Sequence, residues 1–146
     1  MSDSVLNILL AEDNSDDVTL FRMALEKANV SVNLKTVSDG ADAIAYFKGE
    51  NDFSDRTTHP IPDVVLLDLN MPRRNGFEVL EWIRRDQRYK DSLVHILSAS
   101  SREVDVRRTY DLHANSYIVK PSRMNDLVSF ISSLVTWHRF VCLPPR

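Results

Sequence analysis

Residues 64–72 have the sequence VVLLDLNMP, and the predicted fold is built around this stretch. Four consecutive apolar residues, two of them β-branched, run directly into the acid Asp68. So short an apolar run, followed by turn-forming residues, is typical of a strand buried on both faces, as in a parallel sheet. Asp68 is then expected at the carboxyl end of that strand, where open α/β sheets bind their ligands. The loop behind it holds Asn70, Pro72 and Gly76.

Strand-like and helix-like patterns alternate five times along the chain. The predicted strands are residues 5–11, 32–37, 64–67, 93–98 and 116–119. The predicted helices are residues 14–28, 41–48, 76–86, 100–112 and a last segment from 122 through 134. This alternation predicts an α/β fold, a doubly wound five-stranded parallel sheet with helices on both faces. Right-handed crossovers favour the flavodoxin-like strand order 2-1-3-4-5.

Cap residues predict where three of the helices begin. Asn14 precedes a first turn rich in acids, which the helix dipole favours. Ser100 and Glu103 have the spacing of a capping box. Ser122 is the expected cap of the last helix.

The bulk composition is that of a soluble globular chain. Its 146 residues predict one domain, and 43% of them are hydrophobic and 27% charged. A net charge of −3 gives no reason to expect nucleic-acid binding. No apolar run approaches the length of a membrane span, and no signal peptide is recognisable at the N-terminus. The single cysteine, Cys142, excludes an internal disulfide and predicts a reducing, cytoplasmic location.

Polar side chains follow abruptly after four of the predicted strands. They are Glu12 with Asp13, then Asp68, Ser98 and Lys120. Each alone is also consistent with a solvated surface side chain. The carboxyl ends of parallel strands meet at one edge of the sheet, so these residues are expected to share one shallow cleft.

Three carboxylates in one cleft repel each other unless a cation lies between them. Mg²⁺ suits such a site because it prefers oxygen ligands and binds through one or two carboxylates with several waters. We expect Asp13 and Asp68 as direct ligands, Glu12 mainly through water, and a backbone carbonyl near Asn70.

With the acids neutralised, Asp68 is the candidate nucleophile toward a phosphoryl group and would form an aspartyl phosphate. Phosphoryl transfer depends on positioning and charge neutralisation more than on covalent help. Lys120 would give the phosphoryl oxygens a positive charge, and Ser98 a hydrogen-bond donor.

These residues resemble the receiver domain of two-component response regulators. The match rests on Glu12-Asp13-Asn14, on residues 68–72 with Gly76, on Ser98-Ala99 and on Lys120-Pro121, and it spans about residues 5–135. The resemblance implies that Asp68 accepts a phosphoryl group from a histidine of a partner kinase. It also implies Mg²⁺ held by Glu12, Asp13, Asp68 and the Asn70 carbonyl, with Ser98 and Lys120 on the phosphate.

The resemblance further assigns a conformational switch. Tyr117 occupies the position of the family's switch aromatic, whose ring turns inward when Ser98 moves toward the phosphate. The peptide bond between Lys120 and Pro121 is expected to be cis, as in similar proteins. The surface that responds is formed by the predicted helix 100–112, strand 116–119 and last helix.

Three further stretches resemble the small stand-alone regulators paired with bacterial and cyanobacterial phytochrome kinases. These are the long loop 49–62, residues 110–117 and the C-terminal stretch from Trp137. The resemblance implies a homodimer through the responsive surface and the tail, 136–146. The candidate dimer residues are Tyr117, Trp137, Phe140 and Leu143; the alternative is that the tail folds back on its own domain.

Two other functions are considered. A Mg²⁺-dependent phosphohydrolase with an aspartyl nucleophile usually has a second acid two residues later, where this chain has Asn70. A scaffold that is never phosphorylated would not need the acids, Ser98 and Lys120. About ten residues follow the predicted last helix, too few for an output domain in this chain, so we expect a phosphoacceptor that signals by changing its partner affinity.

Overall fold

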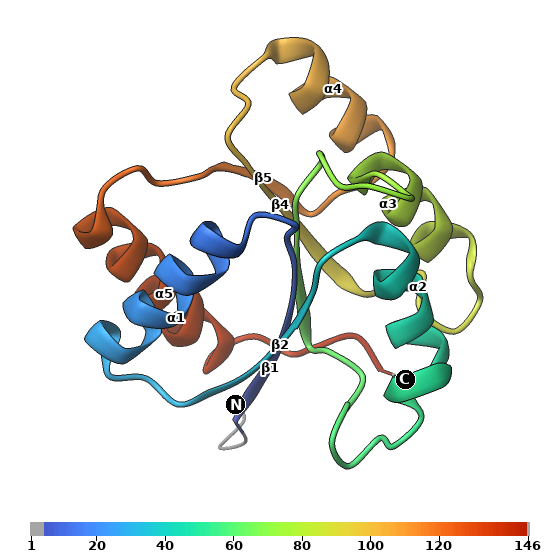
Figure 1. Ribbon diagram of the computed structural model, residues 1–146, viewed down its shortest axis with the longest axis horizontal. Coiled ribbons are helices and arrows are strands. Elements are labelled where there is room, and N and C mark those ends of the chain that lie inside the picture. Colours follow the sequence, from blue (N-terminus) through green and yellow to red (C-terminus); the bar gives the residue numbers. More distant parts are fainter. Residues whose placement is uncertain (1–4, 146) are drawn as a thin grey trace.

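The computed structural model describes residues 5–145, in which five parallel strands alternate with five α-helices (Figure 1). The elements are β1 (Leu6–Ala11), α1 (Ser15–Ala28), β2 (Val32–Val37), α2 (Gly40–Lys48), a 3-10 turn η1 (Asn51–Phe53), β3 (Val64–Leu67), α3 (Gly76–Arg85), β4 (Leu93–Ser98), α4 (Glu103–Asp111), β5 (Ser116–Val119) and α5 (Met124–His138). The predicted alternation is confirmed.

The sheet order is β2-β1-β3-β4-β5, as predicted. All four neighbouring pairs are parallel, and β3 lies between β1 and β4 in the middle of the sheet. Every residue of β3 is buried, which explains why its sequence is uniformly apolar rather than alternating.

Two helical layers cover the sheet (Figure 1). Helices α1 and α5 pack together on one face, and α2, α3 and α4 lie on the other. The α1–α5 side contains a buried core that includes Phe21, Leu66 and Ile131. The opposite core is richer in aromatic rings and includes Tyr46 and Phe47. The side chains of β3 alternate between these two cores, so this strand is buried on both faces of the sheet.

The helix starts differ in how well the cap signals predicted them. Asn14 caps α1, as expected, because its side chain accepts the Asp17 N–H. The predicted capping box at Ser100 is wrong: α4 begins at Glu103, and the Ser100 hydroxyl donates instead to the carboxylate of Asp105. The predicted cap at Ser122 is also wrong, because α5 begins two residues later with extended Arg123 as its N-cap.

Two arginines fix the edge of the sheet at which the strands begin, called here the amino edge. The Arg84 guanidinium donates to the carbonyls of Lys90, Ser92 and His113 and to the Asn115 side chain. These acceptors precede β4 and β5. Arg56, in the long loop, donates to the carbonyls of Tyr46, Phe47 and His59, and so joins the end of α2 to the approach to β3.

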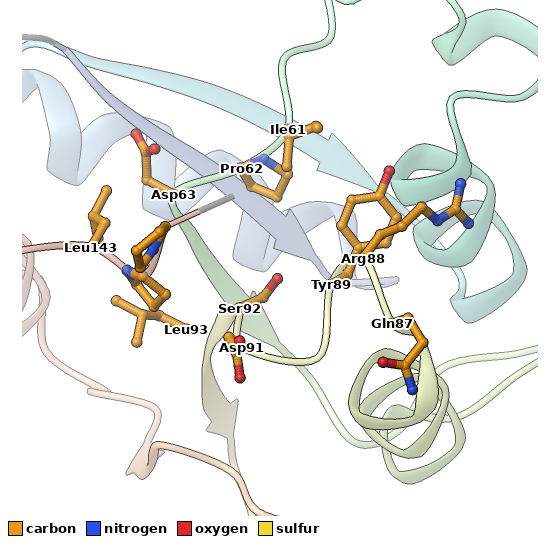
Figure 2. A pocket seen from close by; sticks show the side chains of 12 residues that line it. Ile61, Pro62, Asp63, Gln87, Arg88, Tyr89, Asp91, Ser92, Leu93 and Leu143 are labelled. Atoms are coloured by element: carbon orange, nitrogen blue, oxygen red, sulfur yellow. The ribbon is translucent and has the colours of Figure 1, made fainter.

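The C-terminal tail also lies at the amino edge. Residues 143–145 line a cavity of about 410 Å³ together with residues 61–63 before β3 and with residues 87–89 and 91–93 before and at the start of β4. Figure 2 shows these three segments around the cavity, with Leu143 on the tail side. None of the helices formed by residues 5–145 combines the length and the apolar character that a membrane crossing requires.

Candidate functional site

The backbone brings Glu12 and Asp68 to the same level of the sheet. Ala11 and Leu67, the last residues of β1 and β3, are Cα partners. The Asp68 N–H donates to the Ala11 carbonyl at 3.0 Å, and the Glu12 N–H to the Val37 carbonyl at 2.9 Å. The sheet therefore fixes where both acids leave its carboxyl edge.

Three acids meet there, as the sequence predicted. Glu12, Asp13 and Asp68 each offer a carboxylate oxygen, and the three oxygens lie within 4.8 Å of one another. Glu12 and Asp68 are buried, whereas Asp13 is exposed. A set of oxygen donors open on one side fits a hard divalent cation such as Mg²⁺ or Mn²⁺. Asn70 lies exposed in the loop behind Asp68, and its carbonyl as a further ligand stays a prediction.

The ammonium group of Lys120 lies among these acids. Its Nζ hydrogen-bonds to Glu12 Oε1 and to Asp17 Oδ2, the latter at 2.9 Å, and it is 3.5 Å from Asp68 Oδ2. Asp17 is one of the acids of the predicted acid-rich first turn after Asn14, and the sequence motifs did not include it in the site. The signal that could have found it is proximity, because α1 begins directly after Glu12 and Asp13 and an acid in its first turn lies close to that pair.

Burial and charge shift two pKa values in this cluster. Burial raises the pKa of the Glu12 carboxyl to about 7, and the carboxylate of Asp68 acts in the same direction, whereas the hydrogen bond from Lys120 opposes them. Burial alone would lower the pKa of Lys120. Hydrogen bonds to Asp17 and Glu12, with the charge of Asp68, outweigh that effect and raise it above its ordinary value. The acid cluster thus holds a firmly protonated lysine.

Ser98 and Tyr117 are linked through a single residue, Ser100. The fully buried Ser98 hydroxyl accepts the Ser100 N–H at 3.2 Å. The Tyr117 hydroxyl donates to the Ser100 carbonyl at 2.8 Å. The backbone N–H of Tyr117 on the edge strand in turn donates to the Tyr110 hydroxyl of α4. The two residues predicted to form the switch therefore hold opposite ends of one short segment after β4.

Gly76 allows α3 to begin against the strand that carries Asp68. The Gly76 N–H donates to the Leu69 carbonyl at 2.9 Å. A Cβ atom at this position would lie 2.3 Å from the carbonyl oxygen of Asp68. This distance is too short for any residue with a side chain. The close approach sets the position of Asp68 relative to the first turn of α3.

The expectation of a cis bond between Lys120 and Pro121 is wrong. Every peptide bond in the described part of the chain is trans. The trans isomer is intrinsically favoured before proline, by about 0.5–1 kcal/mol. Here the Lys120 N–H extends the β4–β5 ladder by donating to the Ser98 carbonyl at 2.8 Å, and Lys120 reaches the acids with the bond trans.

The four candidate dimer residues are not equally available. Phe140 is 73% exposed and Trp137 37%, and Trp137 lies in the last turn of α5 rather than in the tail. Tyr117 is half-buried and packs against the core on the α2–α3 side. Leu143 is half-buried and lines the cavity at the amino edge of its own domain (Figure 2). The exposed candidates are thus Trp137 and Phe140.

The family profile of the response regulator receiver domain matches residues 8–132, which includes every residue of the acid cluster and Lys120. The chain belongs to this family. It is therefore a response regulator receiver, and the resemblance found in the motifs is confirmed.

Full-length relatives sharpen the comparison. The chain is 33% identical to the response regulator Rcp1 of Synechocystis sp. strain PCC 6803, over 94% of this chain and 92% of Rcp1. A structure of response regulator RPA3017, in red light signalling of R. palustris, has a TM-score of 0.88 at 36% identity and covers 97% of this chain and 100% of that one.

Two further structures concern phosphate and metal in relatives. The phosphorylated cyanobacterial phytochrome response regulator RcpA has a TM-score of 0.86 at 36% identity, with 97% of this chain and 100% of that chain covered. The Mn²⁺-bound form of Rcp1 has a TM-score of 0.82 at 32% identity, covering 96% and 99%. The acid cluster of this chain is consistent with a phosphoacceptor site that takes a divalent cation.

Proposed function

We propose that Asp68 accepts a phosphoryl group from a histidine kinase with the help of Mg²⁺, and that the phosphorylated chain signals by changing its partner affinity. The observation that carries this proposal is the convergence on Asp68 of two further acids and one lysine at the end of the central strand. Membership of the receiver family supports the same chemistry.

The chain's own residues have separate parts in this reaction. A carboxylate oxygen of Asp68 forms the bond to phosphorus while the phosphorus–nitrogen bond of phosphohistidine breaks, and the imidazole, protonated on its other ring nitrogen, leaves as the neutral base. Glu12, Asp13 and Asp68, with the Asn70 carbonyl, would hold the Mg²⁺, which supplies positive charge to the phosphoryl oxygens when bound. Lys120 would supply a second positive charge and Ser98 a hydroxyl donor.

The contacts of Ser100 suggest how the signal leaves the site. If the Ser98 hydroxyl turns to the phosphoryl group, it stops accepting the Ser100 N–H. The backbone of Ser100 then keeps the Tyr117 hydroxyl on its carbonyl but no longer has the Ser98 hydroxyl on its N–H, while its side chain stays bonded to Asp105. Movement of this segment shifts Tyr117 and with it the surface made by α4, β5 and α5.

The names of the relatives suggest the partner. RcpA is a phytochrome response regulator and RPA3017 acts in red light signalling. By similarity, the kinase partner of this chain is of the phytochrome type. The exposed rings of Trp137 and Phe140 support a homodimer through α4, β5 and α5, because large apolar side chains left in water mark interaction sites.

The proposal is tested by labelling with acetyl phosphate and Mg²⁺. The wild-type chain should acquire acid-labile phosphate, and Asp68→Asn should acquire none. Asp91→Asn is the matched control, because it removes an exposed acid at the opposite edge of the sheet. Undiminished labelling of Asp68→Asn would refute the assignment of the nucleophile.

Partner and assembly need separate measurements. Phosphotransfer from a panel of histidine kinases that includes a phytochrome kinase should be fastest from the phytochrome type; equal rates from all would contradict the pairing. In sedimentation experiments Phe140→Ser should weaken the dimer, and Met23→Ser, an exposed apolar change on α1, should not. An unaltered dimer in Phe140→Ser would exclude this surface.

A further inference from the structure

The ammonium of Lys120 contacts three carboxylates that come from three different segments. Glu12 follows β1, Asp68 follows β3, and Asp17 lies in the first turn of α1. Nζ lies 2.9 Å from Asp17 Oδ2, which is a full hydrogen bond, but 3.5 Å from Asp68 Oδ2, beyond the usual hydrogen-bond range. The lysine is therefore bound more closely by the two acids of the β1–α1 region than by the candidate nucleophile.

We propose that Asp17 is a positioning residue that draws the Lys120 ammonium away from Asp68 and thereby slows phosphoryl transfer. The proposal rests on the proposed function of Asp68 and adds a fourth acid to the site. Asp17 touches no reacting atom and acts only through Lys120.

The competition follows from the donor count of a lysine. An ammonium has three N–H donors and no acceptor, and its flexible stem lets it turn between acceptors. The backbone of Lys120 is fixed by the hydrogen bond from its N–H to the Ser98 carbonyl. Only its side chain can therefore move from one acceptor to another. Phosphoryl oxygens on Asp68 must therefore compete with Asp17 and Glu12 for the N–H donors of the Lys120 ammonium.

The exposure of the two acids makes Asp17 the one that can release the lysine. The side chain of Asp17 is 39% exposed, whereas that of Glu12 is 3% exposed. A partly exposed carboxylate regains water when its partner leaves, so its contact is the easier one to exchange. A buried carboxylate has no such replacement.

Removal of the Asp17 charge should leave α1 in place. The cap of α1 uses the backbone of Asp17 and not its carboxylate: the Asp17 N–H donates to Asn14 Oδ1 at 3.1 Å. Asp16 provides the matched control, because it is an exposed acid in the same first turn. Asp16→Asn and Asp17→Asn lose the same charge from the same helix end, so their difference isolates the contact with Lys120.

The experiment compares the rates of labelling by acetyl phosphate and Mg²⁺. Asp17→Asn should be labelled about threefold to fivefold faster than Asp16→Asn, a factor in the range expected for one partly exposed ion pair. Asp17→Ser should show the same acceleration, which covers the case in which one variant folds poorly. Asp17→Glu, which keeps the carboxylate, should return the rate toward that of the wild type.

A second readout does not depend on turnover. The phosphoryl analogue BeF₃⁻, added with Mg²⁺, should bind more tightly to Asp17→Asn than to Asp16→Asn. Equal rates and equal affinities in the two variants, or a slower Asp17→Asn, would overturn the proposal. If the wild-type chain takes no label at all, the proposed function fails instead, so the two failures are distinguishable.

Discussion

The two edges of the sheet use cations in opposite ways. At the amino edge, Arg56 and Arg84 donate to neutral carbonyl oxygens. Arg56 has three such acceptors, and Arg84 has four, one of which belongs to the side-chain amide of Asn115. At the carboxyl edge, Lys120 lies among three carboxylates and one further acid, Asp13, stands exposed beside them.

The difference shows which edge is built for stability and which for exchange. A guanidinium that donates to several carbonyls at once fixes the loops that carry them, because each of these hydrogen bonds has a charged donor. A lysine shared between acids that outnumber it leaves negative charge uncompensated, and this charge is available to a divalent cation. The four predictions that follow test that contrast, from the largest expected effect to the smallest.

Gly76→Ala should destabilise the fold by about 3 kcal/mol, because the new Cβ would meet the backbone of Asp68 and Leu69. Gly49→Ala, beyond the end of α2, should cost only about 1 kcal/mol, since its strain comes from a positive φ and from a contact with the Arg56 side chain, which can shift more easily than backbone. Urea unfolding measures both. Equal losses would show that the backbone contact at Gly76 constrains the fold no more than the side-chain contact at Gly49 does.

Arg84→Met should lower the free energy of unfolding by about 2 kcal/mol, because it leaves several carbonyls without their donor. Arg85→Met is the control, because the Arg85 side chain is 79% exposed and pairs with Glu81 across one helical turn. Addition of Mg²⁺ should not restore the loss in Arg84→Met. A similar effect of the two variants would remove the special role of Arg84.

Lys120→Met should destabilise the metal-free chain by about 1.5 kcal/mol, because it leaves Glu12 and Asp68 without a cation. Mg²⁺ should recover most of this loss and should raise the melting temperature more in the variant than in the wild type. Thermal unfolding in EDTA and in Mg²⁺ gives both values. If Mg²⁺ raises the two melting temperatures equally, the lysine does not compete with the metal.

His95 is a titratable side chain of β4 that contacts the Ser116 hydroxyl and the Trp137 ring. Burial lowers its pKa below the ordinary value of 6.5. As pH falls below 6.5 the unfolded chain takes up this proton first, so folding stability should fall, at most by about 1.4 kcal/mol per pH unit. His95→Gln should lack this part of the slope in urea unfolding at pH 5–7; identical slopes would contradict it.

Most residues of the carboxyl edge were predictable from sequence, because a short apolar run that stops at a polar residue marks the end of a buried strand. The runs before Glu12, Asp68, Ser98 and Lys120 fixed the strands, and parallel order then brought their ends together. Asn14 was predictable as a cap because its partner is local. The Asn14 side chain accepts the N–H of Asp17, only three residues along the chain.

The misses include contacts between residues far apart in the chain and one local choice between competing partners. Asp17 and Lys120 are 103 residues apart, and Arg84 reaches carbonyls on both sides of α4. The Ser100 hydroxyl was open to several nearby donors and acceptors, and it bonds Asp105 rather than the N3 backbone of a capping box. Spacing alone could not rank such choices, because their energies depend on packing that only the folded chain defines.

The course of the tail has a practical consequence for handling the protein. Residues 143–145 lie beside the starts of β3 and β4, at the edge of the sheet opposite to Asp68 (Figure 1). A chain attached to a sensor surface by its C-terminus would thus turn the acid cluster toward the solution. Kinase and small phosphodonors would meet the same unobstructed face on such a surface, so their rates could be compared on one immobilised sample.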